Sequence, residues 1–197
     1  MDLTAAQPLR TRLLLLCRGP VDWTLADEGD PPLHADAAAD VALAAAGLPH
    51  FDAIVASPQR ACLDTATAIA AARPSALYER DGLDELRTAA MLRGAAERDE
   101  WLDRLYESYT TSADGESLAE GVARFEAALR AVGDRFYGRT TLVVSHPVVL
   151  SAFRASLLQV AASREQVDAL PELALSVVDY LEGRFYLVED FPMRLVP

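Results

Sequence analysis

Short apolar runs alternate with amphipathic stretches along most of the chain. The clearest runs, residues 13–16 and 142–144, each lead directly into polar or reactive residues. Uninterrupted apolar runs of this length are typical of strands that are buried on both faces, as in a parallel sheet. Ligands of open α/β sheets bind beyond the carboxyl ends of such strands. We therefore expect Cys17, Arg18 and His146, which follow the two runs, to lie near one another.

Capping residues mark the ends of several predicted helices. Ser57 is placed as an N-cap with Pro58 in the first turn, Ser117 as an N-cap with Glu120 as its capping-box partner, and Gly47 as a C-cap. The periodicity predicts strands at 12–17, 51–56, 76–79, 140–145, 174–181 and 184–189, and helices at 34–46, 58–72, 97–109, 118–136 and 148–160. Strands that alternate with helices favour a three-layer α/β/α sandwich with a mainly parallel, mixed sheet. We expect a single domain that spans residues 1–197.

The composition is that of an ordinary soluble protein, with 51% hydrophobic and 24% charged residues. No apolar run approaches the roughly 18 residues of a membrane span, and the N-terminus lacks a signal-peptide pattern. We expect a cytoplasmic protein with no membrane partner. The formal net charge of −12 argues against nucleic-acid binding. A small anionic ligand remains compatible with it, because the local field of a pocket can oppose the net charge.

Two residue counts limit the chemistry further. All 18 basic side chains other than histidine are arginine, which excludes a lysine Schiff base and a P-loop lysine. The two cysteines, Cys17 and Cys62, are too few for a metal cluster or a disulfide scaffold. We therefore predict no metal and no cofactor. The sequence leaves the oligomeric state open.

A series of short motifs occurs in a recognisable order. They are the strand into Cys17-Arg18-Gly19, Asp30-Pro31-Pro32-Leu33, the segment 51–66 with Ser57-Pro58 and Thr65-Ala66, Leu83-Asp84-Glu85, Gly115-Glu116-Ser117-Leu118, and Val144-Ser145-His146. Their order and spacing resemble the histidine phosphatase superfamily, which includes the cofactor-dependent phosphoglycerate mutases. The resemblance covers nearly the whole chain and implies a phosphoglycerate mutase-like fold.

The resemblance also implies a phosphoryl-transfer chemistry. In the family a first histidine attacks phosphorus, two arginines and a second histidine hold the phosphoryl oxygens, and a glutamate protonates the leaving oxygen. Aligned without gaps, Arg18 stands at the position of the nucleophile and Cys17 at that of the first arginine. Ala61 falls at the second arginine. His146 and Glu85 match the second histidine and the acid.

A guanidinium cannot replace the nucleophilic imidazole, because it stays protonated and has no lone pair with which to attack. Loss of a nucleophile from a coupled catalytic set costs on the order of a million-fold in turnover. The favoured hypothesis is therefore a degenerate family member that binds a small phosphorylated or other anionic ligand. Arg18, Arg60 and His146 are the candidate anion-binding residues, and an exposed position on the first helical turn is the alternative for Arg60.

Two alternatives remain at this point. One is an active phosphatase or mutase with a rearranged site, in which Cys17 or His146 is the nucleophile. The other is a purely structural or interaction protein, in which an ion pair between Arg18 and Glu85 fills the pocket.

Overall fold

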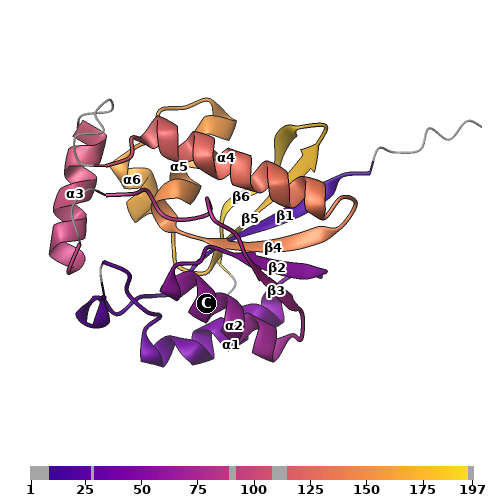
Figure 1. The fold of residues 1–197 in the computed structure, drawn as a ribbon, viewed down its shortest axis with the longest axis horizontal. Helices are drawn as coiled ribbons and strands as arrows, with labels where there is room; N and C mark the ends of the chain where they lie inside the picture. Colours follow the sequence, from indigo (N-terminus) through magenta and orange to yellow (C-terminus); the bar gives the residue numbers. More distant parts are fainter. Residues whose placement is uncertain (1–8, 28, 89–91, 108–114, 195–197) are drawn as a thin grey trace, which may run out of the picture.

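The computed structural model describes residues 9–27, 29–88, 92–107 and 115–194. Six strands form one mixed sheet in the order β3-β2-β4-β1-β5-β6 (Figure 1). The strands β3, β2, β4 and β1 run parallel, whereas β5 and β6 are antiparallel additions at one edge. Their bounds are β1 Thr11–Cys17, β2 Ala53–Ala56, β3 Ala76–Glu79, β4 Thr140–Ser145, β5 Ala174–Leu181 and β6 Arg184–Arg194.

Helices cover both faces of the sheet. Below the sheet in Figure 1 lie α1 (Ala38–Gly47) and α2 (Arg60–Ala72), and above it lie α4 (Leu118–Arg135) and α5 (Pro147–Leu158). A third group, α3 (Ala95–Glu107) and α6 (Arg164–Asp168), lies beside α5 at one end of the molecule. Two 3₁₀ turns, η1 (Trp23–Leu25) and η2 (Ala35–Ala37), belong to the segment that links β1 to α1. The predicted three-layer sandwich is confirmed.

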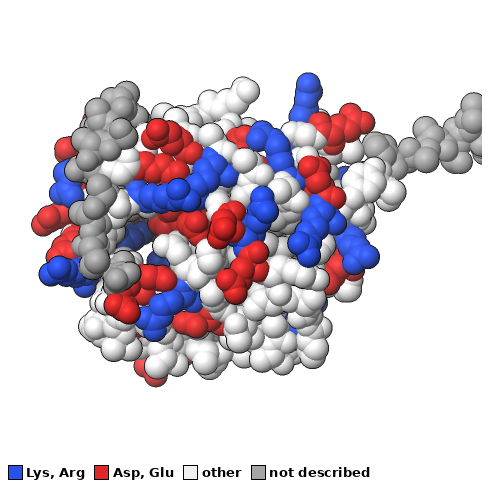
Figure 2. All heavy atoms as spheres, viewed as in Figure 1, with Lys and Arg blue, Asp and Glu red and all other residues white. Residues whose placement is uncertain are grey.

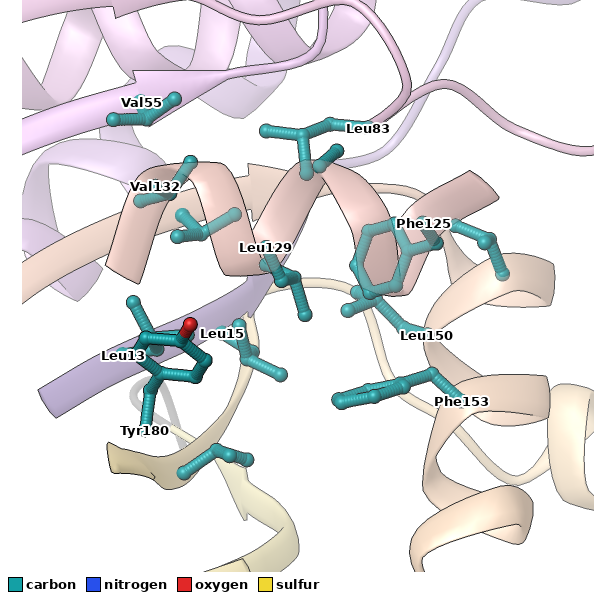
Figure 3. Close-up of a cluster of buried hydrophobic side chains, with 14 of the residues drawn as sticks. Leu13, Leu15, Val55, Leu83, Phe125, Leu129, Val132, Leu150, Phe153 and Tyr180 are labelled. Carbon is teal, nitrogen blue, oxygen red and sulfur yellow. The ribbon is translucent and has the colours of Figure 1, made fainter. Parts of the chain in front are cut away.

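Alternate residues of β1 supply the two hydrophobic cores. Leu13 and Leu15 pack with residues of α4 and α5, including Phe125 and Phe153 (Figure 3). Leu14, on the opposite face, packs against α1 and α2. Successive side chains of a strand point to opposite faces. Because helices cover both faces of the sheet, every position of this strand is buried, and the strand is apolar without interruption.

Most of the predicted elements are present, but two capping assignments are wrong. Gly47 is the last residue of α1 and Leu48 is its C-cap, because the chain leaves the helix in an extended conformation and needs no left-handed glycine. Gln59, not Ser57, is the N-cap of α2, which starts at Arg60. The predicted capping box of Ser117 in α4 is confirmed.

The surface carries acidic and basic side chains side by side on the face shown in Figure 2. Within the described part of the chain, no helix combines the length and the hydropathy that a bilayer span needs. The helix predicted at 97–109 is found as α3, and residues 108–109 lie outside the described residues.

Candidate functional site

The carboxyl ends of three neighbouring strands bring the motif residues together. Cys17 at the end of β1 pairs with Ser145 at the end of β4. The backbone N–H of Arg18 donates to the carbonyl of Ser145 at 2.8 Å, and the N–H of Ser57, just after β2, donates to Val144 at 3.1 Å. Residues that are far apart in sequence therefore begin their loops from adjacent positions, as the strand pattern predicts.

A cavity of about 520 Å³ opens beyond these strand ends. This volume is in the range of small-molecule sites. Four of the residues to which the sequence analysis assigned family site positions line it: Arg18, Ala61, Glu85 and His146. The other lining residues are Trp23, Gly29, Asp30, Pro31, Gln59, Asp84, Leu86, Arg87, Thr88, Leu92, Arg98 and Trp101.

Arg18 is a buried cation in the wall of this cavity. Its side chain donates from Nη1 to the carbonyl of Gly19 at 2.8 Å, and only 7% of the residue is exposed. The guanidinium makes no other hydrogen bond or ion pair with the residues that the structure describes. A guanidinium carries five N–H donors, so Arg18 retains donors for an anion. Its candidate role in anion binding stays a prediction.

The loop behind Arg18 is fixed by close packing on α2. The N–H of Gly19 donates to Oγ1 of Thr65 at 3.1 Å. A Cβ on Gly19 would lie 2.6 Å from Cδ1 of Leu33, a separation that real Cβ contacts essentially never show. A larger residue at this position would therefore require the end of the Leu33 side chain to move.

His146 is buried and its Nε2 is already engaged. Nε2 lies 3.0 Å from Oγ of Ser57 and 3.2 Å from Sγ of Cys62. Because Ser57 donates its hydroxyl proton to the carboxylate of Asp84 at 3.0 Å, its oxygen is the acceptor from His146, and the proton of the neutral ring sits on Nε2. Burial lowers the pKa of His146 well below its usual range, and the charge of Arg18 adds to this effect. His146 is thus a neutral ring in this site.

Glu85 caps a helix instead of pairing with Arg18. Its carboxylate oxygens accept the backbone N–H groups of Val148 at 3.1 Å and Val149 at 2.9 Å, in the first turn of α5. A third N–H, from Leu86, donates to Oε1 at 3.1 Å. The ion pair between Arg18 and Glu85, which one hypothesis required, does not form between these two described residues. A carboxylate at a helix N-terminus is stabilised by the unpaired N–H groups and the helix dipole.

Cys17 faces away from the cavity. It is completely buried in the core cluster on the α4 and α5 face and does not line the site. Burial raises the pKa of its thiol to about 12, although the nearby Arg18 opposes the shift. A thiol with this pKa is protonated near neutral pH, and the thiolate is the reactive form. The structure gives no support to Cys17 as a nucleophile.

Arg60, a candidate from the sequence, lies outside the cavity, whereas Arg98, to which the sequence did not point, lines it. Arg60 is exposed on the first turn of α2, donates from Nη1 to the carbonyl of Leu25 at 3.5 Å, and does not line the cavity. Ala61 lines the cavity, and its methyl group supplies no positive charge there. Arg98 of α3 lines the cavity and interacts electrostatically with Glu85 and Arg18. Sequence reasoning missed Arg98, because α3 reads as a polar helix with no motif.

Arg124 of α4 holds the loop that carries Glu85. Its guanidinium pairs with both carboxylate oxygens of Glu116, at 2.8 and 2.6 Å, and both side chains are mostly buried. The same group donates to the backbone carbonyls of Gly82, Asp84 and Glu85 at 2.9–3.1 Å. The Gly-Glu-Ser motif therefore acts here through Glu116, which orients the arginine that fixes this wall of the cavity.

Within the described ranges, no three His, Cys, Asp or Glu side chains converge in a way that would hold a metal ion. The site instead combines guanidinium groups, a neutral imidazole and carboxylates around an open volume. This arrangement is suited to binding an anion by charge and hydrogen bonds.

The protein is thus an α/β sandwich with a cavity beyond the ends of its central parallel strands, and the charged groups of this cavity are suited to an anion. A model of the histidine phosphatase superfamily (branch 1) matches residues 13–190. The chain belongs to this superfamily. A comparison with curated proteins gave no match.

Solved structures share the fold at low sequence identity. YhfR from Bacillus stearothermophilus has 20% identity and a TM-score of 0.78, covering 95% of this chain and 100% of that one. A phosphoglycerate mutase from Bacillus anthracis has 16% identity and a TM-score of 0.77, with 95% and 96% coverage. A phosphoserine phosphatase mutant from Entamoeba histolytica, in complex with phosphoserine, has 19% identity and a TM-score of 0.76, with 93% and 98% coverage. The predicted phosphoglycerate mutase-like fold is confirmed.

Proposed function

We propose that this protein is a non-catalytic member of the superfamily that binds a small phosphorylated ligand as a single domain. The observation that carries the proposal is Arg18, which occupies the first position after β1 and lines the cavity. In the family, this position supplies the histidine that attacks phosphorus. Arg18 instead presents a permanent positive charge and N–H donors, which hold an anion and cannot form a bond to phosphorus.

Cys17 and His146, the two candidate replacements for the nucleophile, are poorly placed for that role. Cys17 is a protonated thiol in the core. His146 points Nε2 at Ser57 and Cys62, and no described side chain holds its ring as a third member of a catalytic set. An activated nucleophile needs an adjacent base that is itself oriented, so both substitutes lack the arrangement that catalysis requires.

The remaining groups are suited to binding. Arg18 and Arg98 supply positive charge to the cavity, whereas the N–H groups at the start of α5 are already bound by Glu85. Phosphate monoesters match these groups in charge and geometry. The wide cavity also argues against the purely structural alternative, because the ion pair that would fill it is not formed.

The test is a binding and turnover experiment on the full chain. Inorganic phosphate is titrated by isothermal calorimetry, and p-nitrophenyl phosphate is used as the turnover substrate. Binding without turnover is the expected result. Arg18→Met should weaken phosphate binding about 10- to 100-fold, since a hydrogen bond to a charged group is worth about 1.5–3 kcal/mol.

Arg130→Met is the matched control. Arg130 lies on α4 outside the cavity, where it pairs with Glu126, and its loss should leave phosphate affinity unchanged. Turnover that is abolished by Cys17→Ser or His146→Ala would show an active enzyme with a rearranged site and would overturn the proposal. If the protein neither binds phosphate nor turns over p-nitrophenyl phosphate, the alternative of a purely structural or interaction protein remains.

A further inference from the structure

The chain has two tryptophans, and both line the cavity. Trp23 belongs to η1, in the segment between β1 and α1, and Trp101 belongs to α3. The large apolar side chains Leu86 and Leu92 line the same cavity. Beside the charged groups at the strand ends, the cavity therefore has an apolar, largely aromatic part that separate segments of the chain supply.

Trp101 is held rigidly in its place. It is 4% exposed and packs in a buried cluster that includes Leu86 and Val167 of α6. Arg164 of α6 also pairs with two aspartates of α3, at 3.0 and 2.9 Å. The indole is thus part of a wall that exists before a ligand binds, which lowers the entropy cost of binding.

Trp23 is presented by a well-connected turn. The carboxylate of Asp22 accepts the N–H of Thr24 at 2.9 Å and caps η1. The N–H of Asp22 donates to the carbonyl of Pro32 at 3.0 Å, and Val21 forms a bridge with Leu33. These contacts fix the backbone of Trp23, whose side chain is half-buried.

Neither indole has a partner of its own. Among the described residues, no aromatic ring or guanidinium stacks on Trp23 or Trp101, whereas rings such as Phe125 and Tyr78 do have such partners. Neither indole N–H donates to a residue that the structure describes. A deeply buried indole N–H usually has a hydrogen-bond partner. Because Trp101 lines the cavity, a ligand there can contact both its ring and its N–H.

We propose that the ligand is a phosphate monoester whose organic group is a planar aromatic ring. Its phosphoryl group binds at Arg18 and Arg98, and its ring lies against Trp23 and Trp101. The proposal rests on the proposed function, since it needs the phosphoryl group in this cavity. Arg98 and Trp101 are three residues apart on α3 and therefore share a face of the helix. A phosphoryl group and an aromatic ring fit in about 520 Å³.

The test compares three esters that share the phosphoryl group. Methyl, cyclohexyl and phenyl phosphate are titrated into the full chain by calorimetry at pH 8, where all three are predominantly dianions. Cyclohexyl phosphate matches the size of the phenyl ester but has no aromatic ring. An aromatic pair contributes roughly 2- to 10-fold in affinity beyond the area that it buries. With two indoles in the cavity, we expect phenyl phosphate to bind about tenfold more tightly than cyclohexyl phosphate.

Equal affinities for the phenyl and cyclohexyl esters would overturn the aromatic proposal and leave the proposed function standing. If neither the esters nor inorganic phosphate bind, the proposed function fails, and this proposal fails with it. Tryptophan fluorescence locates the ring, because both tryptophans of the chain line the cavity. Phenyl phosphate should change the emission with the same Kd that calorimetry gives. Binding without a change in emission would contradict the proposal.

Variants assign the preference to the two indoles. Trp23→Leu should reduce the tenfold preference to about threefold or less and leave the affinity for methyl phosphate within about twofold, and Trp101→Leu should act in the same direction. Tyr137→Leu is the control, because Tyr137 is an aromatic residue that is 61% exposed and lies outside the cavity. A preference that survives both tryptophan substitutions would contradict the proposal. The comparison of ligands on the unmodified chain stands even if Trp101→Leu does not fold.

Discussion

Arg124→Met would remove the guanidinium that ties α4 to the cavity wall while nearly preserving the volume of the side chain. In the structure this group makes two charged contacts with Glu116 and three with backbone carbonyls. The side chains of Arg124 and Glu116 are only 14% and 12% exposed. Breaking a buried pair by removing one partner costs about 3–5 kcal/mol, because the other charge stays buried without compensation.

The assay is urea denaturation at pH 7, followed by thermal unfolding. For a chain of this size, 3–5 kcal/mol corresponds to a fall in Tm on the order of 10 °C. Arg130→Met is the control on the same helix. The pair of Arg130 with Glu126 is 43% and 22% exposed, and a solvent-exposed pair of this kind is worth below about 1 kcal/mol. A loss below about 1 kcal/mol for Arg124→Met, similar to that of the control, would refute this account of the cavity wall.

The stability difference should also depend on pH. Burial opposes the ionisation of Glu116, but the hydrogen bonds and the charge of Arg124, with the N–H of Arg87, outweigh it and lower its pKa. A group with a lowered pKa stabilises the folded state above its ordinary pKa of 4.5 and loses that contribution as the pH falls through the folded value. The difference between wild type and Arg124→Met should therefore shrink below pH 4.5.

Three further predictions concern the site. Arg164→Ala removes the contacts that hold α3 against α6, so it should weaken phosphate binding several-fold in calorimetry with a loss of stability of about 1 kcal/mol; unchanged affinity would show that α3 needs no such anchor. Cys17→Arg with Arg18→His should not restore full phosphatase activity, and adding Ala61→Arg should raise kcat/KM about 10- to 100-fold; full activity in the double variant would refute the assignment of Ala61. Because burial and then Arg18 lower the pKa of His146 well below 6.5, sulfate affinity should stay within about twofold from pH 8 to pH 6; a tenfold rise on acidification would show that the ring becomes charged.

The sequence predicts the central strands well, because a strand that is buried on both faces is an uninterrupted apolar run. The buried runs at 140–145 and 174–181 are strands with the same bounds in the structure. The edge strand at 76–79 also has the predicted bounds, although it is mostly exposed. The convergence of Arg18 and His146 also follows from sequence, since the carboxyl ends of parallel strands meet at one edge of a sheet. Leu13 and Leu14 in turn show why a continuous apolar run, and not an alternating one, marks the central strand.

The ion pairs and hydrogen bonds of the charged site residues could not be predicted from the sequence. Glu85 looked like the partner of Arg18, but the N–H groups of Val148 and Val149, more than 60 residues further along the chain, take its carboxylate. Arg98 had no signal, because only the packing of α3 turns a residue of a polar helix towards the cavity. Such contacts depend on how helices are placed on the sheet, and neither local propensity nor spacing records that placement.

The central claim is that no nitrogen at the end of β1 can accept phosphorus. It is tested most directly by incubating the full chain with a radiolabelled phosphate donor, quenching in alkali, and measuring acid-labile phosphate on the denatured polypeptide. The Cys17→Arg with Arg18→His variant, which has the imidazole at this position, is the reference for a labelled protein. The account predicts no acid-labile label on the wild-type chain. Stoichiometric label, mapped to His146 or to any other residue, would contradict it.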